Sequence, residues 1–498
     1  MTALEHKELL EKYYRQVNSL ILDKQHPVTG LLPASTAVTI HGDYRDAWVR
    51  DNVYSILAVW GLALAYRRVG NDEGRAYELE QSTVKLMRAL LQAMMRQSGR
   101  IERFKSSQAL HDAIHAKFNP ETGHEVVGDH EWGHLQIDAT SLYLLTLVQM
   151  ISSGLSIIWT VDEVNFIQNL VYYIDRAYRI ADYGIWERGE KTNIGYVELN
   201  ASSIGMAKAA LEALAGFDLF GARGSQASVI HVVPDTIAQA DITLRSMLPR
   251  ESNTKETDAA LLSIIGYPAF AIDDQDLVDL VRNEITSKLQ GKHGLKRFLR
   301  DGHQTAIEDP HRHYYEPEEL RQFENIECEW PLFYCYLLLD AIFRDDLQSI
   351  KFYQKALKSV VVKRGSHELL PELYYVPADL VEQERALPGS QLREPNDNLP
   401  LVWAQSLFLL SQFILDGLIS KNDIDPVGRH KTKVIYDPVV QIVVLAEDAA
   451  LAAELAAHGV QAQTPEDLLP VNVLLPYEII SAYRQIGRND KLGLTGRP

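Results

Sequence analysis

The stretch Asp46-Ala-Trp-Val-Arg-Asp-Asn-Val-Tyr-Ser-Ile-Leu-Ala-Val-Trp60 begins with charged and aromatic residues and then becomes almost wholly apolar. Its spacing predicts a helix over residues 50–69. From Val53 to Leu64 the apolar residues cover a wide face of this helix, which favours packing on both sides. The stretch therefore indicates a helical protein in which some helices are surrounded by others.

Helical periodicity continues through most of the chain. A first helix is indicated by the apolar spacing from Leu9 to Ile21. With the helix over 50–69, the pattern predicts ten more, near 73–97, 136–153, 162–181, 198–216, 234–247, 256–266, 274–289, 325–344, 346–361 and 399–416. The long connections 98–135, 182–197, 290–324 and 362–398 are rich in Gly, Pro, His, Asp and aromatic residues, and long loops in compact domains tend to carry function.

About twelve helices in antiparallel pairs can close into a double ring, with the inner helices around a central funnel and the long loops at one end. An open array of helical repeats would also fit the pattern. The chain shows no clear fixed-period repeat, which argues against such an array. We therefore expect an all-α toroid over residues 1–430.

The pattern changes after residue 430. Short β-type runs at 434–436, 439–445 and 471–475 alternate with helical segments at 447–458 and 478–486, and Gly459 suits the end of the first of these helices. These features predict a small α/β appendage over residues 431–498.

Composition and charge narrow the classes of partner. The 498 residues carry a formal net charge of −18, which repels nucleic-acid backbones and anionic membrane surfaces but not a neutral sugar polymer. The N-terminus has no apolar signal core, and no apolar run is predicted to span a membrane. Only two cysteines are present, which is typical of a reducing compartment. We expect a cytoplasmic protein that binds neither nucleic acid nor membrane.

Several kinds of chemistry lack their sequence motifs. The chain has no phosphate-binding glycine loop, no dinucleotide fingerprint, no HExxH and no nucleophile elbow. His303, His311 and His313 share one loop, but the acidic residues near them lack a recognisable ligand spacing. We predict neither a metal site nor a cofactor.

Five segments instead combine carboxylates with aromatic residues near helix ends. They are residues 43–51 with Trp48, Arg50 and Asp51; 128–138 with Trp132 and Asp138; 182–188 with Trp186, Glu187 and Arg188; 323–331 with Trp330; and 370–375 with Glu372. Sugar rings stack on aromatic side chains, and their hydroxyls bind carboxylates and arginine. Hydrolysis of a glycosidic bond requires two carboxyl groups, one as acid and one as base or nucleophile.

Each segment also has an ordinary structural interpretation. Asp51 and Asp138 could simply cap helices, and Glu187 could be a solvated loop residue. Trp132 and Trp330 taken singly are more typical of a core than of a sugar platform, and Glu372 alone is unremarkable. The repetition of the pattern ahead of alternate helices is what favours a sugar site.

Five runs carry a resemblance to a known family. They are Asp46–Trp60, Pro27–Ala34, Glu163–Val171, Gly184–Arg188 and Phe323–Leu332, which look very like the N-terminal part of the phosphorylase kinase alpha and beta subunits. The likeness extends over nearly the whole chain, including Leu492–Pro498. The helical part of those subunits resembles the glucoamylases of glycoside hydrolase family 15. That resemblance implies an (α/α)6 toroid and inverting release of glucose from α-1,4-glucan ends.

The resemblance also implies roles for individual residues. Glu187 matches the general acid and Glu372 the general base. Arg50 and Asp51 match the pair that grips the terminal glucose. Trp132 and Asp138 fall in the loop that lines the same pocket, and Trp48, Trp186, Arg188 and Trp330 complete the expected binding set. The carboxyl groups of an inverting pair stand roughly 6.5–9.5 Å apart.

Two departures from the glucoamylase pattern bear on function. Many glucoamylases have a second carboxylate after the acid and a Gln after the base, where this chain has Arg188 and Leu373. The retained carboxyl pair favours an inverting α-glucosidase acting on α-1,4-glucans or malto-oligosaccharides. The altered neighbours favour a non-catalytic glucan-binding or regulatory module, which could also bind a protein partner or form a homo-oligomer.

Overall fold

The computed structural model describes most of the chain. The described residues are 3–495, except 36–37, 40–41, 70–72, 129–133, 188–195, 222–223, 313, 366, 432–442, 470–472, 475–477, 480–487 and 490–493. The chain divides into two compact units. The first comprises Met1–Leu219 and Gln226–Lys431, and the second comprises Phe220–Ser225 and Thr432–Pro498.

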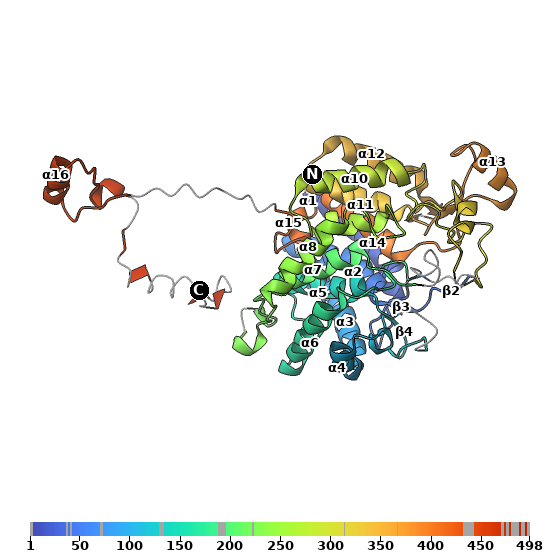
Figure 1. The fold of residues 1–498 in the computed structure, drawn as a ribbon, viewed down its shortest axis with the longest axis horizontal. Coiled ribbons are helices and arrows are strands. Elements are labelled where there is room, and N and C mark those ends of the chain that lie inside the picture. The colour runs from blue at the N-terminus through green and yellow to red at the C-terminus, as the bar shows by residue number, and fades with distance from the viewer. Residues whose placement is uncertain are drawn as a thin grey trace. The chain divides into compact units, whose positions relative to one another are not determined.

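Six inner helices form the centre of the first unit (Figure 1). They are α2 (Val49–Val69), α5 (Ile137–Ser152), α7 (Ala201–Leu214), α9 (Leu262–Ile265), α11 (Leu332–Phe343) and α14 (Val402–Leu415). Contacts run from each to the next and from α14 back to α2, so the ring closes. Nearly all residues of these helices are buried, as the wide apolar face from Val53 to Leu64 predicts.

Six outer helices alternate with the inner ones along the chain. They are α1 (Ala3–Leu20), α3 (Glu73–Met95), α6 (Val161–Ala177), α8 (Pro234–Met247), α10 (Gln275–Leu289) and α12 (Leu347–Val360). Several begin at a side-chain cap: Thr160 and Glu163 form a capping box on α6, and Asp274 and Asp346 cap α10 and α12. The predicted all-α double ring of twelve helices is confirmed.

Shorter elements lie between and after these helices. The additional helices are α4 (Ser98–Ser107), α13 (Val381–Ala386) and α15 (Lys421–Ile424), with 3-10 turns η1 (Leu22–Lys24), η2 (Leu110–Asp112), η5 (Gln226–Ser228), η6 (Ala259–Leu261), η7 (Glu319–Phe323) and η8 (Ala378–Leu380). The strands form two-stranded antiparallel pairs: β1 (Val38–Thr39) with β2 (Gly42–Asp43), β3 (Ala47–Trp48) with β4 (Lys117–Phe118), β5 (Val362–Arg364) with β6 (His367–Leu369), and β7 (Tyr374–Tyr375) with β8 (Glu394–Pro395).

Predicted boundaries are wrong at three places. The connection predicted over 98–135 begins with helix α4, and the helix predicted over 256–266 comprises only the turn η6 and the four-residue α9. The helix predicted over 325–344 begins only at Leu332. Residues 324–326 form a turn instead, and the backbones of Glu329 and Trp330 pair with Tyr374 and Leu295. A turn and the backbone pairing of Glu329 and Trp330 with other loops therefore take the place of the first two turns of the expected helix.

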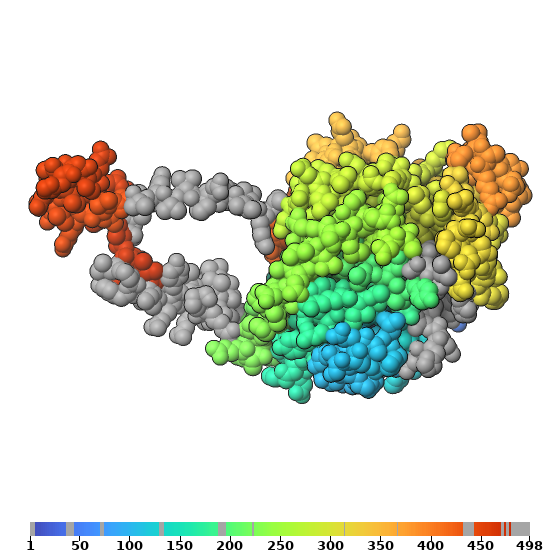
Figure 2. Space-filling model, viewed as in Figure 1, coloured from blue at the N-terminus to red at the C-terminus, as the bar shows by residue number. Residues whose placement is uncertain are grey.

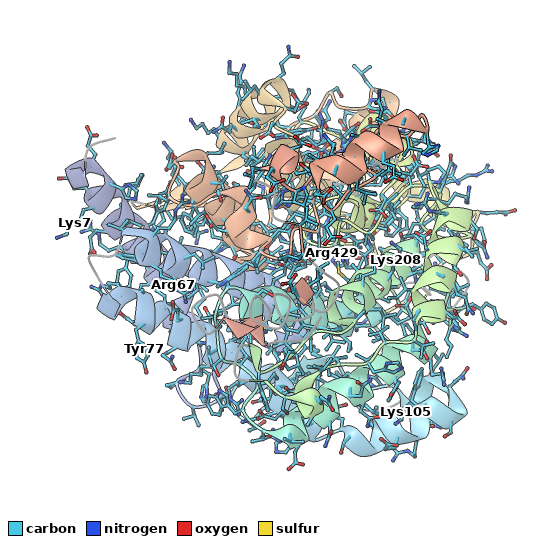
Figure 3. All side chains as sticks on the ribbon, turned by 90° about the vertical axis from the view of Figure 1, so that its left-hand side faces the viewer. Lys7, Arg67, Tyr77, Lys105, Lys208 and Arg429 are labelled. Atoms are coloured by element: carbon cyan, nitrogen blue, oxygen red, sulfur yellow. The ribbon has the colours of Figure 1, made fainter. Side chains whose placement is uncertain are left out.

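The last residues of the first unit are fixed to its inner helices. Asp425 accepts a hydrogen bond of 2.7 Å from Gln149 on α5 and pairs with His430 at 2.6 Å. Arg429 binds Glu212 on α7 at 2.8 Å, and Lys208 binds the same carboxylate at 2.8 Å. Arg429 and Lys208 are both labelled in Figure 3. The segment from Asp425 to His430 is thus an integral part of this unit.

The second unit contains fewer described elements. Helix α16 (Ala449–Ala457) is capped by Asp448, whose side chain accepts the Leu451 N–H, and turn η9 covers Glu466–Leu468. Strands β9 (Arg488–Asn489) and β10 (Leu494–Thr495) pair antiparallel. The predicted strand 434–436, most of 439–445 and most of the helix 478–486 lie outside the described residues. Within 471–475, the two described residues are not in a strand.

No helix in the part of the chain that the structure describes has both the length and the apolar character needed to cross a bilayer.

Candidate functional site

The buried side chain of Arg50 lies at the centre of the candidate site. It extends from the first turn of α2 and is 5% exposed. Its two terminal nitrogens bind Asp138, on the first turn of α5, at 3.1 Å and Glu187 at 2.9 Å, while Nε lies 4.0 Å from Asp51. Burial opposes the charge of Arg50, but Asp138, Glu187 and Asp51 outweigh that effect and raise its pKa. Three predicted segments therefore meet at one guanidinium.

The pKa of Asp51 depends on both Glu187 and Glu372. Burial is the main cause that raises its pKa to about 7; Arg50 lowers it, and the negative charges of Glu187 and Glu372 raise it further. An electrostatic effect of this kind requires both glutamates to be near Asp51. Asp51 therefore lies close enough to both Glu187 and Glu372 for their negative charges to raise its pKa.

The raised pKa of Asp51 predicts a pH dependence of stability. Its folded-state pKa of about 7 exceeds the ordinary value of 3.8, so the folded state binds the proton more tightly and loses stability as pH rises from about 4 through 7. At about 1.4 kcal/mol per pKa unit, the loss is on the order of 4 kcal/mol at most. Asp51→Asn should remove this part of the decline in thermal unfolding between pH 5 and 8. Asp273→Asn, at an exposed position, should leave the decline unchanged, and equal pH profiles for both variants would contradict the assignment.

The backbone at Glu187 has an uncommon conformation. Its φ of +61° lies in the left-handed region, and its N–H donates to the Gly184 carbonyl at 3.2 Å. The neighbouring indole of Trp186 donates to both oxygens of buried Asp258, at 3.0 and 3.1 Å. Because the turn and the indole are both fixed, the carboxylate of Glu187 is directed to Arg50.

An aromatic wall stands beside this turn. The Trp186 ring lies 5.9 Å from that of Trp330 and 5.7 Å from that of Phe333, measured between centroids. The guanidinium of Arg297 lies 5.0 Å from the Trp186 ring and 5.1 Å from the Trp330 ring, and Asp301 binds it at 2.6 Å. Trp330 is therefore both a core residue and a wall of the candidate site.

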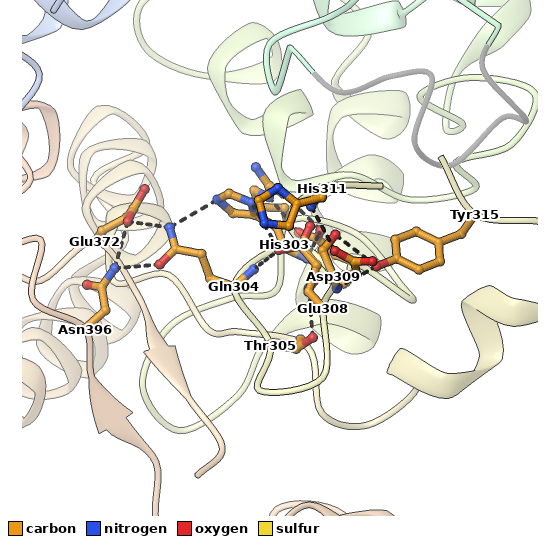
Figure 4. Close-up of polar contacts among 12 residues, drawn as sticks. His303, Gln304, Thr305, Glu308, Asp309, His311, Tyr315, Glu372 and Asn396 are labelled. Atoms are coloured by element: carbon orange, nitrogen blue, oxygen red, sulfur yellow. Dashed lines mark hydrogen bonds and ion pairs between the residues drawn. The ribbon is translucent and has the colours of Figure 1, made fainter. Parts of the chain in front are cut away.

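Glu372 is held by neutral donors. Its Oε2 accepts hydrogen bonds from Gln304 at 2.9 Å and from Asn396 at 2.8 Å (Figure 4). The adjacent Leu373 is buried and supplies no side-chain donor. The donors to Glu372 therefore come from two other stretches of the chain, 68 and 24 residues away, and not from the residue that follows it.

The remaining predicted residues differ in placement. Trp48 is half-buried on β3, with Lys117 4.3 Å from its ring centre and Tyr44 at 6.4 Å between ring centroids; Tyr44 in turn contacts Gln304. Trp132, Arg188 and His313 lie outside the described residues. Among the residues that are described, no three His, Cys, Asp or Glu side chains gather where a metal ion could be held.

Sequence reasoning missed several residues of the site. They are Asp258 beneath Trp186, Arg297 against the aromatic wall, Gln304 and Asn396 on Glu372, and Trp403, whose ring lies 5.7 Å from the Arg50 guanidinium. Gln304 and Asn396 fall in long loops that the composition marks as functional, but nothing local distinguishes them from other amides there.

The closed ring of paired helices, with carboxylates, arginine and tryptophan at one end, defines an (α/α)6 toroid of the glycosidase type. The family profile described as glycosyl hydrolases family 15 matches residues 7–498, so the chain belongs to this family. Solved structures agree in fold. A glycosidase variant matches with a TM-score of 0.57 at 17% identity, and a glycosidase in complex with glucose matches at 0.54 and 16%; each alignment covers 84% of this chain and 100% of the other.

Relatives of much higher identity carry another name. The chain is 53% identical over 496 residues to the phosphorylase b kinase regulatory subunit alpha, liver isoform, of Mus musculus, and 54% identical over 493 residues to a probable subunit of the same name from Drosophila melanogaster. The Caenorhabditis elegans counterpart is 46% identical. These alignments cover 98% of this chain but only 39–40% of the relatives, so the chain spans about two fifths of their length. The resemblance drawn from the sequence is confirmed.

Proposed function

We propose that this chain is a non-catalytic regulatory module that binds the end of an α-1,4-glucan or malto-oligosaccharide at the Arg50 site. Relatives more than 50% identical to this chain are named as regulatory subunits of a kinase, and the glycosidase fold supplies a site of the kind that binds sugars. By the same likeness, we propose that the chain binds partner subunits and acts in the cytoplasm.

Unpartnered polar atoms support the binding of a ligand. Asp138 Oδ1 and Trp330 Nε1 are buried, and neither has a hydrogen-bond partner among the residues that the structure describes. A buried acceptor and a buried donor without partners cost free energy, on the order of 1–3 kcal/mol each. The hydroxyls of a bound sugar, which both donate and accept, would satisfy both atoms.

The ion pair between Arg50 and Glu187 is the observation that carries the non-catalytic assignment. A general acid must hold a proton and present it to the glycosidic oxygen. Here the Oε1 of Glu187 instead accepts a hydrogen bond of 2.9 Å from a buried guanidinium. Such a carboxylate suits the binding of hydroxyl groups better than the donation of a proton.

The second candidate function is inverting hydrolysis, with Glu187 as acid and Glu372 as base. One observation favours it: among the described residues, no donor contacts Oε1 of Glu372, although two donors hold Oε2. A free oxygen on a fixed carboxylate is what a base needs to activate water. The separation of 6.5–9.5 Å between the two carboxyl groups stays a prediction.

Binding and turnover of maltoheptaose separate the two functions. For the regulatory module, calorimetry should detect binding, no glucose should be released, and Glu187→Gln should change the affinity by only a few-fold because Gln keeps an acceptor for Arg50. For the hydrolase, glucose should appear and Glu187→Gln should lower its release at least 100-fold. Release that is abolished by this substitution would overturn the proposal, and absence of binding would overturn both functions.

A further inference from the structure

We infer that Gln304 and Asn396 form an amide clamp that positions Glu372, fixing its Oε2 and presenting Oε1 to the glucan. The inference deepens the proposed function and rests on it. Both amides are positioning residues, since they act on the ligand only through the carboxylate.

The clamp is a closed triangle of hydrogen bonds (Figure 4). Gln304 Nε2 and Asn396 Nδ2 both donate to Oε2 of Glu372, at 2.9 and 2.8 Å. Asn396 Nδ2 also donates to Gln304 Oε1 at 3.0 Å. Each amide therefore fixes the other as well as the carboxylate, and Glu372 cannot rotate without breaking both bonds to Oε2.

Local contacts fix Gln304 before it reaches Glu372. Its backbone is left-handed, with φ of +56°, and its N–H donates to the buried carboxylate of Glu308 at 2.7 Å. Its Nε2 also lies 3.0 Å from the Tyr44 hydroxyl and 3.2 Å from His303 Nε2. A left-handed backbone costs free energy at a residue other than glycine, so it persists only where the surrounding contacts hold it. Such residues cluster at functional sites.

Asn396 is fixed by the strand pair that adjoins Glu372. It directly follows β8, whose partner β7 begins two residues after Glu372. Its N–H donates to the Leu373 carbonyl at 3.1 Å, and the Glu372 N–H donates to the Asn398 carbonyl at 3.0 Å. The backbone thus aligns the amide with the carboxylate.

The two arms of the clamp reach the outer surface of the first unit. Residues near Gln304 and the α13 segment near Asn396 lie side by side there, yellow and orange in Figure 2. The connection that carries Gln304 contacts the end of the α13 segment through Lys292, whose Nζ donates to the Gly389 carbonyl at 2.6 Å, and beneath the surface Arg393 forms a buried ion pair of 3.1 Å with Glu329. The orientation of Glu372 therefore depends on how these two surface segments pack together.

The chemistry of the clamp differs from that of the Arg50 side of the site. Neutral amides stabilise a carboxylate through hydrogen bonds without neutralising its charge, and hydrogen bonds to a charged acceptor are stronger than those to a neutral one. With both donors on Oε2, the remaining oxygen keeps its full capacity to accept a hydrogen bond from a sugar hydroxyl or a water.

The test replaces each donor in the full chain and measures maltoheptaose affinity by calorimetry. Gln304→Met, which keeps the length but loses the donor, should weaken binding about 10- to 100-fold. Gln304→Glu and Asn396→Asp place an acid against Glu372, so their affinity should be closer to wild type at pH 5, where the new acid can donate a proton, than at pH 8. A loss caused only by misfolding would not recover with pH in this way.

Gln383→Glu is the matched control, since it makes the same chemical change at an exposed position on α13. It should bind like wild type at both pH values, and clamp variants that behave like it would overturn the inference. If the wild-type chain binds no maltoheptaose, the proposed function fails, yet the clamp is still tested by thermal unfolding. The Tm losses of Gln304→Met and Glu372→Gln should then be non-additive, and additive losses would refute the clamp.

Discussion

Arg50→Gln should destabilise the first unit by about 3–5 kcal/mol and abolish glucan binding. The substitution leaves the buried carboxylates of Asp138 and Glu187 without their shared cation, and Asp51 without the positive charge that lowers its pKa. Removing one partner of a buried ion pair costs far more stability than a surface ion pair contributes, because the remaining charges stay uncompensated in the low-dielectric interior. Denaturant unfolding and maltoheptaose calorimetry measure the two effects.

Two further variants identify the cause of this loss. Arg68→Gln removes an exposed arginine paired with Asp423 at 2.9 Å, and it should cost less than about 1 kcal/mol. Adding Glu187→Gln to Arg50→Gln removes one uncompensated charge, so it should restore part of the stability. An Arg50 variant as mildly affected as the Arg68 variant would show that Arg50 is not the cation that holds the site together.

Gly294→Ala should unfold the aromatic wall and cost more than about 3 kcal/mol. A Cβ at Gly294 would lie 2.3 Å from the backbone of Trp330 and 2.7 Å from the Pro331 nitrogen, and the glycine has φ of +156°. Backbone atoms cannot move aside as a flexible side chain can, and this backbone is held by the pairing of Leu295 with Trp330. The Trp330 ring should shift and glucan affinity should fall with the stability, both measurable on the same sample.

Gly216→Ala separates steric collision from backbone strain. Gly216 also has a positive φ, +73°, but a Cβ there would meet nothing within 4 Å. The strain alone should cost about 1 kcal/mol or slightly more, with no loss of glucan affinity. Equal losses for the two variants would mean that the close approach at Trp330 is unimportant.

The fold was predictable because its signal is local. The wide apolar face from Val53 to Leu64 already separates a buried helix from a half-buried one, and the same distinction recurs along the chain. The errors arise where tertiary contacts override local pattern. Glu329 and Trp330 fall in a stretch whose pattern predicts a helix, but their backbones pair with Tyr374 and Leu295. Helix α4 begins at Ser98-Gly99, residues that usually mark a loop.

The site was predictable only in part. Charged residues in the first turn of an inner helix, such as Arg50, Asp51 and Asp138, could be predicted from their position in the sequence. Their pairing could not be: nothing local shows that Glu187 is bound to Arg50 or that its backbone is left-handed. The donors on Glu372 come from positions 68 and 24 residues away, so they emerge only when the two loops meet.

The contacts of Asp425, Arg429 and His430 with the inner helices determine where the chain can be shortened. A recombinant form that stops after Lys431 keeps the Asp425–Gln149 and Arg429–Glu212 contacts and retains the whole of the first unit. A form that stops at Ile424 loses both contacts, so the buried side chain of Gln149 no longer has Asp425 to accept its hydrogen bond. The seven residues from Asp425 to Lys431 therefore determine whether a shortened form keeps the contacts that fix the end of the first unit to its inner helices.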